Sequence, residues 1–114
     1  MKKIKFSCSL DSTNLTRSGE YRIKIVAPFS ELSKAVSLLS FLNSPFTIVV
    51  ISQGERVEVK EVWLHKLDID RFGESRVIFT MDYQMLGSTS VGFFGSCQNK
   101  PIVIGCKGGQ DEEE

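Results

Sequence analysis

The chain lacks any long apolar run and is sparing with the residues that carry metal chemistry. Its longest apolar stretch, residues 46–51, has the length of a strand, whereas a membrane-spanning helix needs about 18 such residues. The lysine-rich start is not followed by the apolar segment of a signal peptide. These absences predict a cytoplasmic protein with no membrane segment.

Cysteine and histidine are too few and too scattered to predict a metal site. The chain has three cysteines, Cys8, Cys97 and Cys106, and a single histidine, His65. An odd number of cysteines without a secretory signal favours reduced thiols, although Cys97 and Cys106 could pair across a hairpin. No Cys-x-x-Cys spacing occurs, so we expect neither zinc nor any other cofactor.

What the chain does have is an ordinary globular composition. Its 114 residues are 41% apolar and 25% charged, which suits one domain with a core of its own. We expect this domain to cover residues 1–107. The two glycines at 108 and 109 then introduce an acidic segment, so residues 108–114 are predicted to be a disordered tail.

Alternating apolar and polar residues predict two strands near the N-terminus. Residues 3–10 and 20–27 each place apolar side chains on one face and polar side chains on the other. Residues 11–19 have the composition of a turn, so the strands should form a hairpin or lie as near neighbours in one sheet.

The pattern then changes to one helix followed by more strands. Apolar residues at helical spacing predict an amphipathic helix over residues 31–43. Strands are expected at 46–51, 56–70, 75–83 and, as a short edge strand, 101–105, with a loop at 86–100.

Within residues 56–70 the apolar parity switches twice, which indicates bulges or a crossing between sheets. The predicted fold class is α+β: a bent antiparallel sheet, or a small partly open barrel, with the one helix packed on it.

No pattern in the chain predicts catalysis. Residues 87–92 have two glycines at the spacing of a phosphate-binding loop, but the lysine that must follow is absent. Asp68 and Asp70 could share a strand face, and two carboxylates in that geometry can hold a hard cation or do acid–base work. An enzyme would require these two carboxylates and His65 to meet in one cleft. We therefore predict a protein that is not an enzyme and has no catalytic residue.

The charges are sorted along the sequence. Residues 1–24 carry a net charge of +4 and residues 25–110 carry none, while residues 111–114 are all acidic. Five basic side chains near the start form the candidate nucleic-acid-binding set: Lys3, Lys5, Arg17, Arg22 and Lys24. If the two strands are adjacent, four of these cations share one patch that attracts phosphates. The alternative is an ordinary charged solvent face.

Three phenylalanines are candidates for base stacking or for contact with a partner. Phe72 lies in a predicted turn next to Arg71, and Phe93 and Phe94 lie between glycines. The phenylalanine pair could equally anchor its loop in the core, and we favour that interpretation.

The C-terminal Gln-Asp-Glu-Glu-Glu resembles the acidic tails of single-stranded-DNA-binding proteins of bacteria and phages, although it lacks their apolar end. That resemblance implies a tail that competes with DNA for a basic face. The lysine-rich strand, the Ser-Gly-Glu-Tyr turn at 18–21 and the following strand and helix resemble small uncharacterised proteins encoded beside phage replication genes. This second resemblance implies an accessory role.

Two hypotheses follow. The first is a non-enzymatic accessory protein that binds nucleic acid, single-stranded in particular, through the basic strand face, with the acidic tail as competitor. The alternative is a protein-interaction or assembly module, such as a homodimer, that binds no nucleic acid and uses an edge strand or the Phe93–Phe94 segment.

Overall fold

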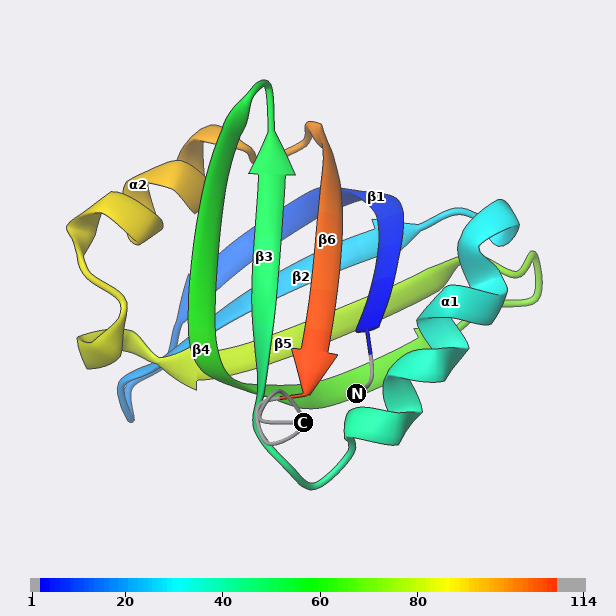
Figure 1. The fold of residues 1–114 in the computed structure, drawn as a ribbon, viewed down its shortest axis with the longest axis horizontal. Helices are drawn as coiled ribbons and strands as arrows, with labels where there is room; N and C mark the ends of the chain where they lie inside the picture. The colour runs from blue at the N-terminus through cyan, green and yellow to red at the C-terminus, as the bar shows by residue number, and fades with distance from the viewer. Residues whose placement is uncertain (1–2, 109–114) are drawn as a thin grey trace.

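The structure, a computed structural model, describes residues 3–108 (Figure 1). Most of the chain is in strands, which run antiparallel to their neighbours: β1 (Lys3–Leu15), β2 (Glu20–Ala27), β3 (Phe46–Ser52), β4 (Glu55–Ile69), β5 (Ser75–Asp82) and β6 (Pro101–Gly108). The helical segments are η1 (Phe29–Glu31), α1 (Leu32–Ser37), η2 (Leu38–Phe41), η3 (Tyr83–Met85) and α2 (Ser88–Ser96).

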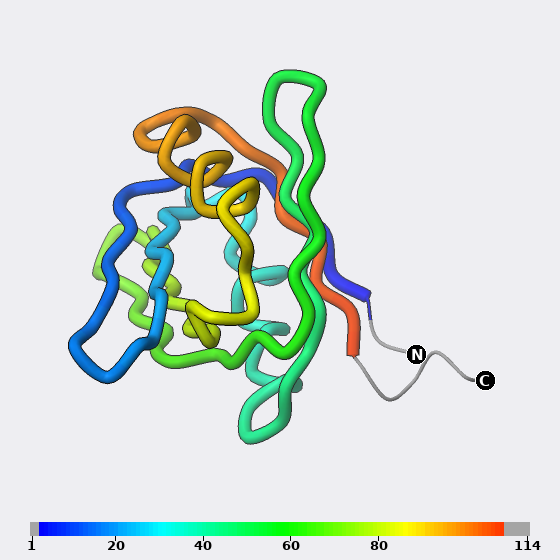
Figure 2. Tube along the Cα trace, turned by 90° about the vertical axis from the view of Figure 1, so that its left-hand side faces the viewer, coloured from blue at the N-terminus to red at the C-terminus, as the bar shows by residue number. Residues whose placement is uncertain are grey.

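The strand order β1-β2-β5-β4-β3-β6 closes on itself as a barrel, because β6 pairs with both β3 and β1. Figure 2 looks along this ring, with residues 83–96 at the end nearer the viewer. The expected α+β class and antiparallel sheet are confirmed. The expected edge strand at 101–105 is wrong, since β6 lies between two partners and extends to Gly108.

Two long strands belong to both sides of the ring. Residues 3–9 of β1 pair with β6 and residues 9–15 pair with β2. Residues 55–62 of β4 pair with β3, and residues 63–69 pair with β5. We call the side formed by β6, β3 and the first parts of β1 and β4 the front half, and the side formed by β2, β5 and their second parts the rear half (Figure 1).

Each long strand changes partners near interruptions of its register. The pairing shifts between Leu10 and Ser12 in β1, and in β4 opposite Thr47 and again between Leu64 and Lys66. A bulge bends a strand and increases its twist, so a continuous strand can turn the corner between two sheets. The parity switches in residues 56–70 predicted the two irregularities of β4. The expected turn at 11–19 was too long, because β1 continues through its bulge to Leu15.

The predicted helix over 31–43 is shorter and irregular. Residues 29–41 form a short α-helix between two 3₁₀ turns, and Leu42 has extended backbone angles. Its buried residues are Ala35, Leu38 and Phe41, and the Phe41 ring stacks on that of Phe46 at a centroid distance of 4.8 Å. A helical segment this short takes its stability from such packing more than from its own hydrogen bonds.

The predicted loop at 86–100 is wrong, because residues 88–96 form α2. Glycine, serine and threonine disfavour a helix, and this composition suggested a loop. Packing outweighs propensity here. Phe93 and Phe94 are 7% and 0% exposed, and the Phe94 ring lies 6.1 Å from that of Tyr21. The pair therefore anchors the segment in the core. The fold has two α-helices rather than one, on opposite sides of the view in Figure 1.

The core fills the interior of the ring with apolar side chains from all six strands, η2 and α2. All three cysteines belong to it, and none forms a disulfide. Burial raises the pKa of Cys8 to about 12 and also raises that of Cys106, so both thiols stay protonated and unreactive at neutral pH. Among residues 3–108, no helix is both long and apolar enough to cross a membrane.

The helix α2 yields a prediction about stability. Phe94→Ala should lower the free energy of unfolding by about 3–5 kcal/mol, because it leaves a cavity under the helix. Phe72→Ala is the matched control, since that ring is 73% exposed and its loss should cost about 0.5 kcal/mol or less. Urea unfolding measures both values. Equal effects of the two substitutions would contradict the placement of Phe94 in the core.

Candidate functional site

The predicted basic set does not form one patch. Lys3 and Lys5 lie on the part of β1 that pairs with β6, opposite Lys107 and Gly105. Arg22 and Lys24 lie on β2, opposite Asn14 and Ser12 at the other end of β1. The two pairs are thus separated by roughly 20 Å of strand and face outward from different halves.

The rear cations are balanced by nearby acids. A guanidinium nitrogen of Arg22 lies 3.0 Å from a carboxylate oxygen of Glu20, and the ammonium of Lys24 lies 4.0 Å from Asp11. These side chains are between one third and one half exposed, so each pair contributes about 0–1 kcal/mol to stability. Although this contribution to stability is small, each acid cancels the positive field of its partner. The rear half is therefore a poor attractant for phosphate.

The front half has the stronger basic surface. Lys3 and Lys107 are directly opposite on neighbouring strands, and Lys5 follows on the same face of β1. Within residues 3–108, Lys3 and Lys5 form no ion pair, while Lys107 lies 3.8 Å from Glu58. Like charges on directly opposed residues repel. An anion bound between them would relieve that repulsion. Lys107 could not be found from the sequence, because its position depends on which strand pairs with β1.

The remaining predicted residues fall at separate places. Arg17 is exposed in the turn between β1 and β2, far along β1 from Lys3. Phe93 and Phe94 are buried. Phe72 is exposed at the β4–β5 turn, where the guanidinium carbon of Arg71 lies 5.2 Å from its ring centroid. The acidic residues 111–114 lie outside the described part of the chain.

A second exposed ring beside Phe72 was not foreseen. Phe29 is 66% exposed and lies against the turn, so closely that a side-chain carbon added at Gly73 would overlap its ring. Gly73 also has a φ of +81°, which favours glycine. Phe29 and Phe72 are thus both exposed around the β4–β5 turn.

The carboxylates considered for catalysis have structural partners. Asp70 accepts hydrogen bonds from the backbone N–H groups of Phe72 and Glu74 and lies 3.1 Å from Arg76. Asp68 sits opposite Arg76 and pairs with Lys66 at 3.5 Å, and His65 is the residue at the second bulge of β4. Among residues 3–108, no group of three His, Cys, Asp or Glu side chains is placed to hold a metal ion.

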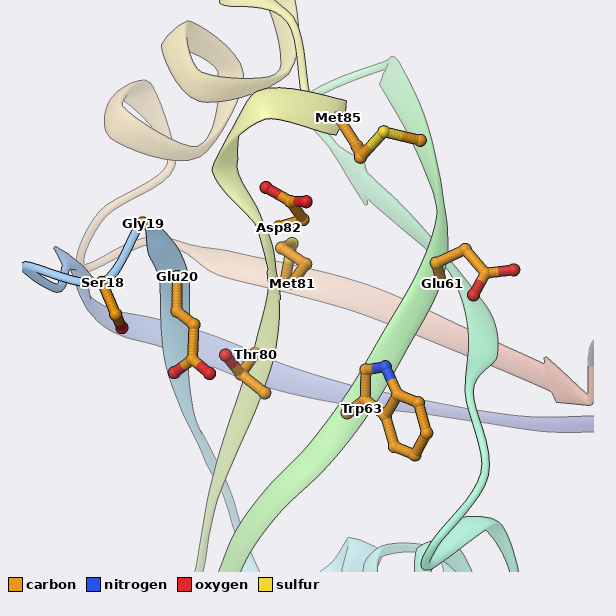
Figure 3. Close-up of a pocket in the computed structure, with 9 residues that line it drawn as sticks. All are labelled: Ser18, Gly19, Glu20, Glu61, Trp63, Thr80, Met81, Asp82 and Met85. Carbon is orange, nitrogen blue, oxygen red and sulfur yellow. The ribbon is translucent and has the colours of Figure 1, made fainter.

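The structure also contains a pocket that the sequence did not suggest, drawn in Figure 3. It is an open cavity of about 710 Å³ lined by Ser18, Gly19, Glu20, Glu61, Trp63, Thr80, Met81, Asp82 and Met85. Trp63 is the first residue along β4 that pairs with β5, because Val62 before it pairs with β3. The end of β5 beyond Thr80 therefore has no partner on the β4 side, and the cavity opens there.

Trp63 could have been recognised from the sequence. Val62 and Leu64 share one parity, and an apolar pair at alternate positions predicts an inner face, so the tryptophan between them is predicted to face outward. It is 43% exposed. An outward tryptophan on a strand is unusual enough to mark a binding surface.

No protein-family model matches the chain, and a search of curated proteins finds no match to it.

Asp70 yields a prediction about pH. The hydrogen bond from the Glu74 N–H, with smaller contributions from Arg76 and Phe72, lowers its pKa below the ordinary 3.8. A carboxyl whose pKa is lowered by folding stabilises the protein above its unfolded pKa, and this contribution is lost as pH falls through the lowered value. Asp70→Asn should thus be less stable than the parent at pH 7, and the difference in melting temperature should shrink below about pH 4.

Thermal unfolding between pH 7 and pH 2.5 measures this difference. Asp68→Asn serves as the control, because it removes a neighbouring charge without touching the turn. A difference for Asp70→Asn that stays constant over the whole pH range would show that the ionised form has no special role.

Proposed function

We propose that the protein is a non-enzymatic, intracellular accessory protein that binds single-stranded nucleic acid through the outer face of the front half. The observation that supports this most is the pair of adjacent strands that present Lys3, Lys5 and Lys107 on one face. This differs from the sequence-based set, because Lys107 takes the place of Arg22 and Lys24. Neighbouring lysines on a flat face fit successive phosphates of a backbone and carry no base specificity.

The surroundings of these lysines support the same proposal. Arg56, on β4 at the far side of this face, and Lys107 share one acid, since Glu58 lies 3.7 Å from Arg56 and 3.8 Å from Lys107, so the acid offsets only one of these two cations. The centre of the face carries Val49 and Val103, partly buried, with Gly105 between β1 and β3. Such a smooth centre lets a strand of nucleic acid lie across it. Its affinity should be weak and should depend strongly on salt, since exposed aromatic rings are missing from the described residues of this face.

The acidic residues at the C-terminus are the proposed competitor of nucleic acid for these lysines. It follows β6 directly, and Lys107 of β6 is paired with Lys3. The carboxylates at 111–114 begin a few residues after Lys107, which allows them to reach the same lysines. We propose that they compete with phosphate there, as the resemblance to the tails of single-stranded-DNA-binding proteins implies.

Fluorescence anisotropy of a labelled oligothymidine across a salt series tests the proposal. Lys3→Gln combined with Lys5→Gln should weaken binding and reduce the log–log salt slope by about 1.4, because each phosphate contact on a single strand contributes about 0.7. Arg22→Gln combined with Lys24→Gln is the matched control with the same loss of charge. Removal of residues 111–114 should tighten binding at low salt.

Two outcomes would contradict this proposal. If the rear control loses as much affinity as the front variant, the binding is not localised to the front half. If removal of the tail leaves the low-salt affinity unchanged, competition by the tail is wrong.

The exposed rings of Phe29 and Phe72 favour a second candidate, an assembly module. The sequence-based version of this idea used an edge strand or the Phe93–Phe94 segment. The described strands all have two neighbours, and Phe93 and Phe94 are buried. We therefore place the contact of this candidate at Phe29 and Phe72, where two large rings lose contact with water on association.

Sedimentation velocity over a concentration series tests the second candidate. A self-associating parent should become monomeric as Phe72→Ser, because the substitution removes the most exposed ring without disturbing the core. Leu15→Ser, at another exposed apolar residue, is the control and should leave association unchanged. A parent that is monomeric at all concentrations would rule out the homodimer.

A further inference from the structure

We infer that the pocket around Trp63 is a binding site for a guanidinium group, such as the side chain of an arginine. This site is separate from the basic face of the front half and does not depend on the proposed function. The inference combines the cavity, an exposed indole, carboxylates without cationic partners and a buried hydroxyl oxygen without a hydrogen bond.

The first component is the aromatic wall. Trp63, the one tryptophan of the chain, lies on β4 at the edge of the cavity, with the exposed Met85 nearby on η3. A guanidinium is planar and weakly hydrated, so it stacks on an indole face better than an ammonium does. Stacking of this kind needs an open and partly apolar pocket, and the exposed Met85 adds apolar surface to the lining.

The second component is the arrangement of carboxylates. Glu20 and Asp82 are directly opposite on β2 and β5, where like charges repel each other. Glu61 lies on β4, across the cavity from them (Figure 3). Glu20 pairs with Arg22, but Asp82 and Glu61 form no ion pair within residues 3–108. Asp82 accepts a hydrogen bond from the backbone N–H of Gln84, and a bound cation would supply the charge partner that it and Glu61 lack.

The position of Glu61 depends on the first bulge of β4. Its φ is +61°, which is uncommon for a residue other than glycine. Two residues of β4, at 60 and 61, occupy the space opposite Thr47, and both are exposed. The bulge thus turns the Glu61 side chain to the outer surface, beside the tryptophan two residues along.

The third component is an unused hydrogen-bonding group. Two buried polar atoms at this place have no partner among the described residues: the hydroxyl oxygen of Thr80, which lines the cavity, and the Nε of Arg22, which is opposite Thr80 on β2. A guanidinium has five N–H donors and no acceptor, so it can donate to a carboxylate of the cavity while its plane stacks on the indole. A phosphate or a carboxylate ligand would instead be repelled.

Intrinsic fluorescence tests this inference, because Trp63 is the sole tryptophan. Titration with N-acetyl-arginine amide should change the emission in a saturable way, whereas N-acetyl-citrulline amide, which is uncharged and nearly the same shape, should not. Glu61→Gln and Asp82→Asn should each raise the dissociation constant about three- to fivefold. Asp68→Asn is the matched control and should have little effect, because Asp68 lies on β4, as Glu61 does, but outside the pocket.

Glu61→Gly separates binding from folding. Glycine adopts a φ of +61° without strain, so this variant should melt no lower than the parent and still bind arginine amide as weakly as Glu61→Gln. Equal responses to arginine and citrulline, no saturation, or equal loss of affinity in Glu61→Gln and Asp68→Asn would each overturn the inference.

Titration with a second ligand distinguishes an arginine within a protein segment from a free guanidinium compound. A capped pentapeptide, Ser-Gly-Arg-Gly-Ser, should bind more tightly than the amide if the natural ligand is a protein segment, since the backbone at the end of β5 is unpaired on the pocket side. Equal affinities would indicate a free guanidinium compound. Both outcomes support the site, and they distinguish its two possible sources.

Discussion

The fold depends on two strands that are each shared between the two halves of the sheet. β1 and β4 pair with one neighbour over their first part and with another over their second part. A straight strand cannot pair with two different neighbours in turn without losing hydrogen bonds to one of them. Each change of partner therefore needs a local irregularity. The bulges of β1 and β4 supply it, and the helical segments then pack at the remaining open sides.

The same bends determine where the candidate sites lie. Because β1 changes partner, its first lysines join β6 and Lys107, while the cations of β2 are left on the rear half with acidic partners. Because β4 changes partner at Trp63, the end of β5 is unpaired on one side and a cavity opens. Both surfaces are thus consequences of strand pairing rather than of local sequence.

This explains what the sequence could predict. Alternation gave the face of each side chain correctly for β2 and β5, and the parity switches located the bulges of β4. Alternation does not say which strand lies alongside, so it could not separate Lys3 and Lys5 from Arg22 and Lys24. Residues 11–15 were missed because a bulged, polar strand looks like a turn. α2 was missed because its stability comes from the burial of Phe93 and Phe94, which outweighs poor helix propensity.

A chain of zero net charge can carry an anion-binding face and a cation-binding pocket only if the two fields do not cancel. In the front half, β6 and β3 lie between β1 and β4, so Lys3 and the bulge at Glu61 are about three strand spacings, roughly 14 Å, apart. The Debye length at physiological salt is about 8 Å. Each surface therefore attracts its ligand through its own nearest charges, and the sign of the net charge does not bear on either. At low salt the screening weakens, and the basic face and the acidic pocket then act on each other's ligands as well as on their own.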